Sequence, residues 1–97
     1  MKEYVFKTDF PRIDSTNAFD FQDEMEEGIE DFYTKDADMF VVDMMKTTYL
    51  SSAGLRILAS AYKKIKANGK NFIMRNVSEG LQDLFDVTGL SGYLPME

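Results

Sequence analysis

The chain has 97 residues, a length that allows one small domain covering residues 1–97. It contains no cysteine and no histidine, which excludes disulfides, thiolate nucleophiles and the commonest general base and transition-metal ligand. Its net charge of −6 argues against direct nucleic-acid binding, which needs clustered Lys and Arg. We therefore expect a binding protein rather than an enzyme, with no catalytic residue, no metal and no cofactor.

The N-terminal residues lack the long apolar segment of a signal peptide. No stretch approaches the roughly 20 apolar residues that a membrane-spanning helix requires. These features predict a cytoplasmic protein without membrane insertion.

The first predicted elements are a strand and a helix. Residues 2–8 alternate as a half-buried strand does, and Phe10-Pro11 interrupts the pattern. Asp14, Ser15, Thr16 and Asn17 are helix-capping residue types, and we interpret Asp14 as a cap. One apolar stripe with spacings of three and four then predicts a helix, formed by Ala18, Phe21, Met25, Ile29 and Phe32.

The middle of the chain predicts a second strand and a second helix. Residues 39–45 are almost continuously apolar, as in a central strand that is buried on both faces. After a polar turn, a helix runs to about Asn68, and Gly69 is well placed to end it in a left-handed conformation. The apolar face of this helix consists of Leu55, Leu58, Tyr62 and Ile65.

The last third predicts a strand over residues 71–77, a helix capped by Ser78 and ended by Gly89, and a short final strand over residues 90–94. Strands that alternate with helices indicate the α/β class. We expect a mixed sheet of four to five strands with a mostly parallel centre, and about three helices packed on it.

The segment from Asp43 to Arg56 is the best candidate for a functional site. In α/β proteins, function usually lies where strands end and helices begin. Four hydroxyl groups lie in this segment, on Thr47, Thr48, Ser51 and Ser52. Two interpretations stay open: Ser51 or Ser52 only caps the helix and Gly54 only lets it pack closely, or a phosphate or a partner approaches the backbone at Gly54.

Around this segment the sequence resembles the STAS domains, especially the bacterial anti-sigma factor antagonists. The strand Val41-Val42-Asp43 and the following residues 49–58, which contain Ser51-Ser52-Ala53-Gly54-Leu55, resemble the family pattern of a strand ending in Asp followed by Ser-Ser-x-Gly-Leu. Three further stretches match in order and spacing: residues 12–18, 68–70 and 84–90. Together they cover about residues 4–95.

This resemblance implies the fold described above and a role in transcription regulation. It implies that Ser52 is phosphorylated by a partner that is both an anti-sigma factor and a serine kinase. The unphosphorylated protein would bind this partner, the phosphoprotein would release it, and a serine phosphatase would reset the switch. The implied partner-binding residues are Thr47, Thr48, Ser51, Ser52, Ala53, Gly54 and Arg56.

Three features depart from the family pattern, and the first is that Pro11 replaces the glycine usual before the first helix. Ser51 stands where many antagonists have Asp, and there is room for one strand before the first helix where the family often has two. A shortened sheet can leave an exposed strand edge, which favours dimers, and we expect a monomer or a weak homodimer. The alternative function is a STAS scaffold subunit of a signalling or membrane-transport complex that is never phosphorylated, in which Ser52 is only a cap.

Overall fold

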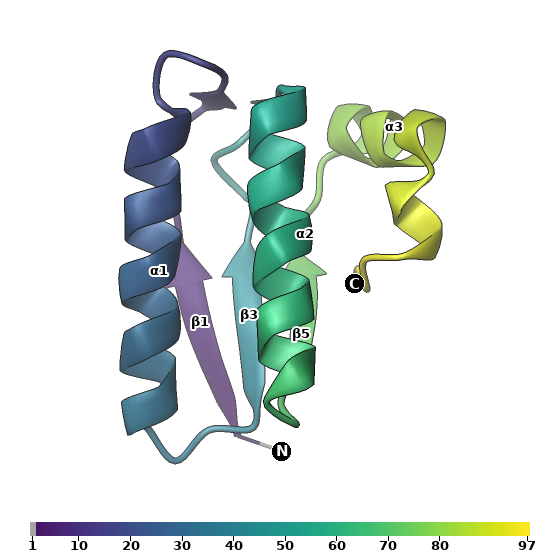
Figure 1. Ribbon diagram of the computed structural model, residues 1–97. Coiled ribbons are helices and arrows are strands. Elements are labelled where there is room, and N and C mark those ends of the chain that lie inside the picture. Colours follow the sequence, from purple (N-terminus) through teal and green to yellow (C-terminus); the bar gives the residue numbers. More distant parts are fainter. Residues whose placement is uncertain (1) are drawn as a thin grey trace.

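The computed structural model describes residues 2–97, and Met1 lies outside this range. The described residues form one parallel sheet in the order β1-β3-β5, a separate parallel pair β2-β4, three α-helices and a short 3-10 helix. The strands are β1 (Glu3–Lys7), β2 (Arg12–Ile13), β3 (Met39–Asp43), β4 (Tyr49–Leu50) and β5 (Asn71–Arg75). The helices are α1 (Ala18–Thr34), α2 (Ser52–Ala67), α3 (Glu79–Thr88) and η1 (Leu90–Gly92). Helices α1 and α2 lie side by side on one face of the three-stranded sheet, whereas α3 lies to the side, beyond β5 in this view (Figure 1).

The central strand is β3, as its apolar run predicts. Phe40, Val41 and Val42 are all fully buried, although their side chains point alternately to opposite faces of the sheet. Phe40 pairs with Tyr4 on one side and with Phe72 on the other. The rings of Phe40 and Phe72 are stacked with centroids 6.3 Å apart.

The α/β class, the parallel centre and the three helices are confirmed, but the arrangement of the strands differs from the prediction. The five strands among residues 2–97 belong to two sheets instead of one, and every strand pairing is parallel rather than mixed. The break at Phe10-Pro11 explains the second sheet, because the chain leaves the main sheet after β1 and forms β2 beside β4. The expectation of one strand before the first helix was therefore wrong, since β1 and β2 both precede α1.

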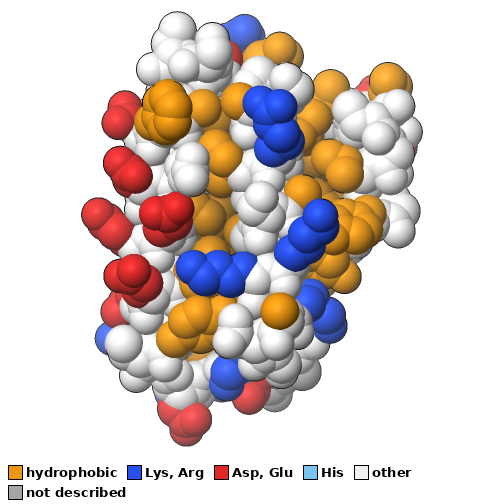
Figure 2. All heavy atoms as spheres, viewed as in Figure 1, with side chains coloured by type: hydrophobic (Ala, Val, Ile, Leu, Met, Phe, Trp, Pro, Cys, Tyr) orange, Lys and Arg blue, Asp and Glu red, His pale blue; other side chains and the backbone are white. Residues whose placement is uncertain are grey.

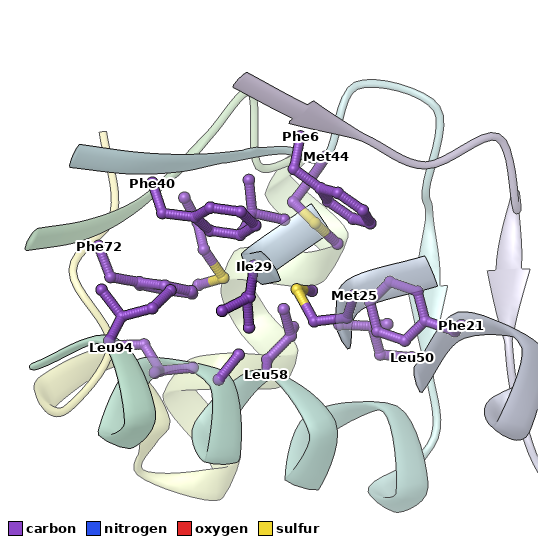
Figure 3. Packing of buried hydrophobic residues seen from close by; sticks show 14 of the residues in the cluster. Phe6, Phe21, Met25, Ile29, Phe40, Met44, Leu50, Leu58, Phe72 and Leu94 are labelled. Atoms are coloured by element: carbon purple, nitrogen blue, oxygen red, sulfur yellow. The ribbon is translucent and has the colours of Figure 1, made fainter. Parts of the chain in front are cut away.

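The core lies between the main sheet and the two helices that cover it. Phe6, Phe40 and Phe72 point from the strands toward Ile29 and Leu58 of the helices (Figure 3). The predicted stripe of α1 supplies part of this core, since Phe21, Met25, Ile29 and Phe32 are buried. Phe19, one position away from the stripe, is 80% exposed.

The opposite face of the sheet is crossed by an ion pair. Arg75 on β5 donates to both carboxylate oxygens of Glu3 on β1, at 3.0 and 2.9 Å, and its Nε donates to Glu97 at 2.6 Å. Because β3 lies between β1 and β5, this pair extends across β3, where Val41 is fully buried.

The predicted ends of two helices are confirmed. Gly69 and Gly89 adopt positive φ angles of 75° and 81° just after α2 and α3, as expected for left-handed helix stops. Ser78 caps α3, because its Oγ accepts a hydrogen bond from the backbone N–H of Leu81 at 3.2 Å.

Two local predictions were wrong. Residues 90–94 do not form a strand: the N–H of Leu94 bonds back to the carbonyl of Leu90 at 2.7 Å, and Met96 makes the bridge to Met74 instead. Asp14 is not a helix cap, because its Oδ1 accepts from the backbone N–H of Thr16, which precedes α1. Asn17 occupies the cap position of α1, but its side chain bonds backward to Asp14 and Arg12.

Candidate functional site

The turn between β3 and α2 is fixed to the segment that follows β1. Thr47 is fully buried, and its Oγ1 donates to the carbonyl of Phe10 at 2.8 Å. Thr48 is exposed, and its Oγ1 donates to the carbonyl of Pro11 at 3.2 Å. Lys46 forms an exposed ion pair with Asp9 at 2.9 Å. Three consecutive side chains of the turn therefore hold it against one neighbouring segment.

The small β2-β4 sheet continues this attachment up to the first turn of α2. Backbone N–H groups of Thr48 and Ser51 donate to the carbonyls of Pro11 and Ile13, both at 2.8 Å. The guanidinium of Arg12 lies 4.3 Å from the centre of the Tyr49 ring, a distance typical of a cation–π contact. The position of Ser51, directly before α2, is thus set by strand pairing.

Gly54 lies in the first turn of α2 and faces inward. A Cβ at this position would lie 3.1 Å from Ile13 Cγ2 and 3.1 Å from Leu50 Cδ2. The missing side chain therefore allows α2 to pack closely on the β2-β4 sheet. Of the two interpretations of Gly54, this supports close helix packing rather than the approach of a phosphate or a partner. Gly54 is buried, so its side offers no surface to a partner in this conformation.

Ser51 and Ser52 differ sharply in their surroundings. Ser51 occupies the cap position of α2, but its side chain makes no cap hydrogen bond, and its Oγ is buried without a partner within residues 2–97. Ser52 is the first residue of α2 and is exposed. Within the described part of the chain its hydroxyl forms no side-chain hydrogen bond. Ser52 is therefore the accessible hydroxyl at the start of this helix.

The first turn of α2 also leaves backbone donors free. The first bond along the helix is from the N–H of Leu55 to the carbonyl of Ser51 at 3.0 Å, so the N–H groups of residues 52–54 precede the intrahelical ladder. Free N–H groups and the helix dipole together favour an anion at this point. The exposed Arg56 follows Ser52 by about one turn on the same helix.

Asp43, at the end of β3, connects this site to the turn before α3. Its Oδ1 accepts from Asn76 Nδ2 at 3.1 Å and from the N–H of Met45 at 3.0 Å. The hydrogen bond from Asn76, aided by that of Met45 and by the charges of Lys7 and Arg75, holds the pKa of Asp43 below its ordinary value. Asn76 itself has a φ of 60°, a left-handed conformation that Asn tolerates better than most residues.

The structure brings the predicted site residues together around the start of α2 but divides them into two groups. Thr48, Ser52 and Arg56 are exposed, and Ser51 and Ala53 are partly exposed. Thr47 and Gly54 are buried and can only position the others. Sequence reasoning missed the contribution of Phe10, Pro11 and Ile13, because their backbone groups carry no residue-specific pattern.

The surface next to the site contains a groove between α1 and α2 with a volume of about 430 Å³. Ala53 and Arg56 line one end of it, beside Ser52, together with Ser15 and Ala18. No helix within residues 2–97 is long and apolar enough to cross a membrane.

The chain is similar in sequence to known proteins. The family model for the STAS domain matches residues 5–97. The anti-sigma-B factor antagonist of Listeria monocytogenes is 25% identical over 73 residues, which cover 75% of this chain and 64% of that protein. That of Bacillus subtilis is 40% identical over 43 residues, which cover 44% and 39%. The matches thus span less than two thirds of the length of these relatives.

Solved structures share the fold at low sequence identity. The anti-sigma factor antagonist SpoIIAA in its unphosphorylated form superposes with a TM-score of 0.71 and 14% identity, covering 99% of this chain and 80% of that one. A sulfate transporter family protein from Wolinella succinogenes gives a TM-score of 0.77 and 16% identity, with 95% and 70% covered. These likenesses establish the architecture.

Proposed function

The chain belongs to the STAS domain family, and from this premise we propose that it is a phosphorylation-switched regulator that opposes an anti-sigma factor. The unphosphorylated form binds an anti-sigma factor that is also a serine kinase, and phosphorylation of Ser52 releases it. A serine phosphatase returns the protein to its binding form. The observation that carries this proposal is the exposed, unbonded hydroxyl of Ser52 at the start of α2.

The local geometry explains how such a switch can work without unfolding the domain. A phosphate on Ser52 adds a charge of about −1.5 to −2 next to the free N–H groups of the first turn, which favour anions. The turn below it is held by Thr47 and by the β2-β4 pairing, neither of which involves the Ser52 side chain. The new charge therefore acts outward, on a partner surface that had packed against a neutral hydroxyl.

The exposed residues around Ser52 define the proposed partner surface. Thr48 and Arg56 contribute directly, Ser51 and Ala53 contribute their accessible atoms, and Thr47 and Gly54 keep the surface in place. The names of the curated relatives support an anti-sigma factor as the partner.

A scaffold subunit is the second candidate function. The fold is shared with a sulfate transporter family protein as well as with anti-sigma factor antagonists, so the fold alone fits either function. In this role the same surface would bind a partner that is not a kinase, and Ser52 would stay unmodified.

Phosphate mapping separates these two functions. The protein is incubated with ATP and the kinase-type anti-sigma factor encoded in the same genome, and its intact mass is measured. We expect the gain of one phosphate by wild type and by Ser60→Ala, which removes another exposed serine of α2, and no gain by Ser52→Ala. Phosphorylation that persists in Ser52→Ala would exclude Ser52 as the acceptor, and no phosphorylation of wild type would favour the scaffold.

Binding of the same anti-sigma factor tests the switch itself. Ser52→Asp should weaken binding by about tenfold or more, because it places a charge in a contact formed around a neutral group. Ser52→Asn has a similar size without the charge and should bind within a few fold of wild type. Equal affinities for the Asp and Asn variants would contradict a charge-operated switch.

A further inference from the structure

The groove between α1 and α2 is open along the outer face of the molecule. Its floor is apolar and is formed by Met25 and Ile29 of α1 and by Ile57 and Ala61 of α2. A strip of hydrophobic side chains is visible there between the two helices (Figure 2). Phe19 lines one end of the groove and is 80% exposed, so it extends the apolar strip, and contiguous exposed apolar surface marks interaction sites.

The two walls of the groove carry opposite charges. Acidic side chains form a column over α1, and Lys and Arg side chains form a column over α2 (Figure 2). Glu26 lines the groove from α1, and Arg56 and Lys64 line it from α2. Within residues 2–97, neither Arg56 nor Lys64 takes part in an ion pair, and Glu26 accepts only from Gln22. These charges are therefore available to a second molecule.

This arrangement is complementary to itself. Rotation of a copy by 180° about an axis that runs along the groove places α1 of the copy over α2 of the first molecule, and the reverse, at the same height. Glu26 of each copy then faces Lys64 of the other, one such pair on each side of an apolar centre. We propose that a second copy of this chain docks face to face on the α1-α2 groove, forming a four-helix contact.

Spacing along the helices supports this pairing. Phe19 and Glu26 are seven residues apart on α1, a rise of about 10.5 Å, and Arg56 and Lys64 are eight apart on α2, a rise of about 12 Å. Phe19 and Arg56 line the same end of the groove. In the dimer, Phe19 thus faces Arg56 of the second copy while Glu26 faces Lys64 of the second copy, and symmetry makes each contact twice.

The limited size of the face indicates a weak dimer. The molecule measures 33 × 26 × 21 Å, and two helices cover only part of its broadest side. A stable dimer buries about 800 Å² per partner, so this contact is of the weak class, with a dissociation constant on the order of 10⁻⁴ M. Pairing occurs although the net charge of each chain is −6, because the facing charges are of opposite sign.

The inference stands apart from the proposed function, but the two surfaces meet. Ala53 and Arg56 belong both to the groove and to the surface around Ser52. Self-association would therefore compete with any partner that binds at Ser52. At high concentration, protein without a partner would be mainly dimeric.

Self-association is tested by sedimentation equilibrium of the purified chain from about 10 µM to 1 mM, a range centred on the expected dissociation constant. We expect a dimer fraction that rises with concentration and falls with added salt, since the exposed ion pairs are screened. A monomer at 1 mM would overturn the proposal and leave the groove to a helix of another protein or to a small apolar ligand.

Charge reversal identifies the contact surface. Glu26→Lys sets two lysines against each other across the dimer, and Lys64→Glu sets two glutamates, so each variant alone should self-associate about tenfold more weakly or worse. An equal mixture of the two variants should recover association, because Lys at 26 then faces Glu at 64. Only a contact between these two positions predicts recovery in the mixture.

Matched reversals on other surfaces serve as controls. Asp83→Lys on α3 and Lys66→Glu on α2 change the net charge equally, are exposed and do not line the groove, so they should leave association within about threefold of wild type. Dimers that are unaffected by the groove variants, or that the mixture does not restore, would show that a different face is used.

Discussion

Helices α2 and α3 begin with the same backbone conformation at the cap residue, but only α3 has a side-chain hydrogen bond that caps its first turn. Each follows a strand and has a serine cap in extended conformation, with φ −78° and ψ 175° at Ser51 and φ −66° and ψ 159° at Ser78. Ser78 closes the start of α3 with a hydrogen bond to the N–H of Leu81. Ser51 does not close α2, and the exposed Ser52 follows it. Ser52, the proposed phosphorylation site, therefore lies at the helix start whose backbone donors remain free.

The glycines in the first turns of α2 and α3 differ in how closely other residues pack against them. Gly54 of α2 is wedged between Ile13 and Leu50, whereas a Cβ at Gly80 of α3 would meet nothing within 4 Å. The first turn of α2 is therefore closely packed at Gly54 and has free backbone donors, whereas the first turn of α3 is capped by Ser78 and has a solvent-exposed glycine.

The largest expected effect is at Gly54. Gly54→Val would drive a branched side chain into Ile13 and Leu50 and should lower the free energy of unfolding by about 2 kcal/mol or more. Gly80→Ala should raise it by about 0.5 kcal/mol, because Ala is the better helix former. Urea denaturation measures both, and similar effects at the two sites would contradict the difference in packing.

The two cap serines should respond unequally to removal of their hydroxyls. Ser78→Ala should cost about 1 kcal/mol, the usual value of a helix cap. Ser51→Ala should stay within about 0.5 kcal/mol of wild type or stabilise, because the hydroxyl that it removes is buried and unpaired. Thermal unfolding of both variants under identical conditions checks this, and a loss of 1 kcal/mol at Ser51 would show that its hydroxyl is bonded.

A pH-dependent effect should appear at Asp43, which links the turns before the two helices through Asn76. The pKa of Asp43 is lowered in the folded protein, so its contribution is present above the unfolded value of about 3.9 and is lost as the pH falls through the lower folded value. Asp43→Asn should therefore lose stability less steeply than wild type below about pH 4.

Unfolding curves measured at intervals from pH 6 downward test this prediction. Asp83→Asn, on the exposed side of α3, is the control and should follow the wild-type profile. Parallel profiles for wild type and Asp43→Asn would exclude a role of Asp43 in acid stability.

The smallest effect is expected at Ser52. Ser52→Asp places a negative charge in the first turn of α2 and should stabilise the fold by about 0.5 kcal/mol at low ionic strength, an effect that salt screens. Ser52→Asn should show no such dependence on salt. A clear destabilisation by Asp would contradict the open, anion-favouring start of α2.

The features that sequence predicted correctly are those that depend on neighbouring residues. The apolar stripe of α1, the Ser78 cap and the left-handed Gly69 and Gly89 are set within one or two turns of chain. The position of Ser52 at the start of α2 follows from the same local pattern. Its exposure, by contrast, depends on contacts made by distant residues.

The features that sequence missed arise where distant segments meet. Strands β2 and β4 have two residues each and lie 37 positions apart in register, too short to produce any periodic pattern. The burial of Thr47 results from the carbonyl of Phe10, and that of Gly54 from Ile13 and Leu50. The predicted strand over residues 90–94 failed because Gly89 turns the chain back on α3 before it can reach the sheet.

The parallel register of the main sheet has a consequence for the order in which the chain folds. Phe6 pairs with Val42 across 36 positions, and Val42 pairs with Met74 across 32, so each ladder must close a long loop before it gains any contact. Because β3 takes part in both ladders, we expect the transition state for folding to be built around it. Val42→Ala should then slow folding, whereas Phe72→Leu at the edge should chiefly speed unfolding, as stopped-flow kinetics would show.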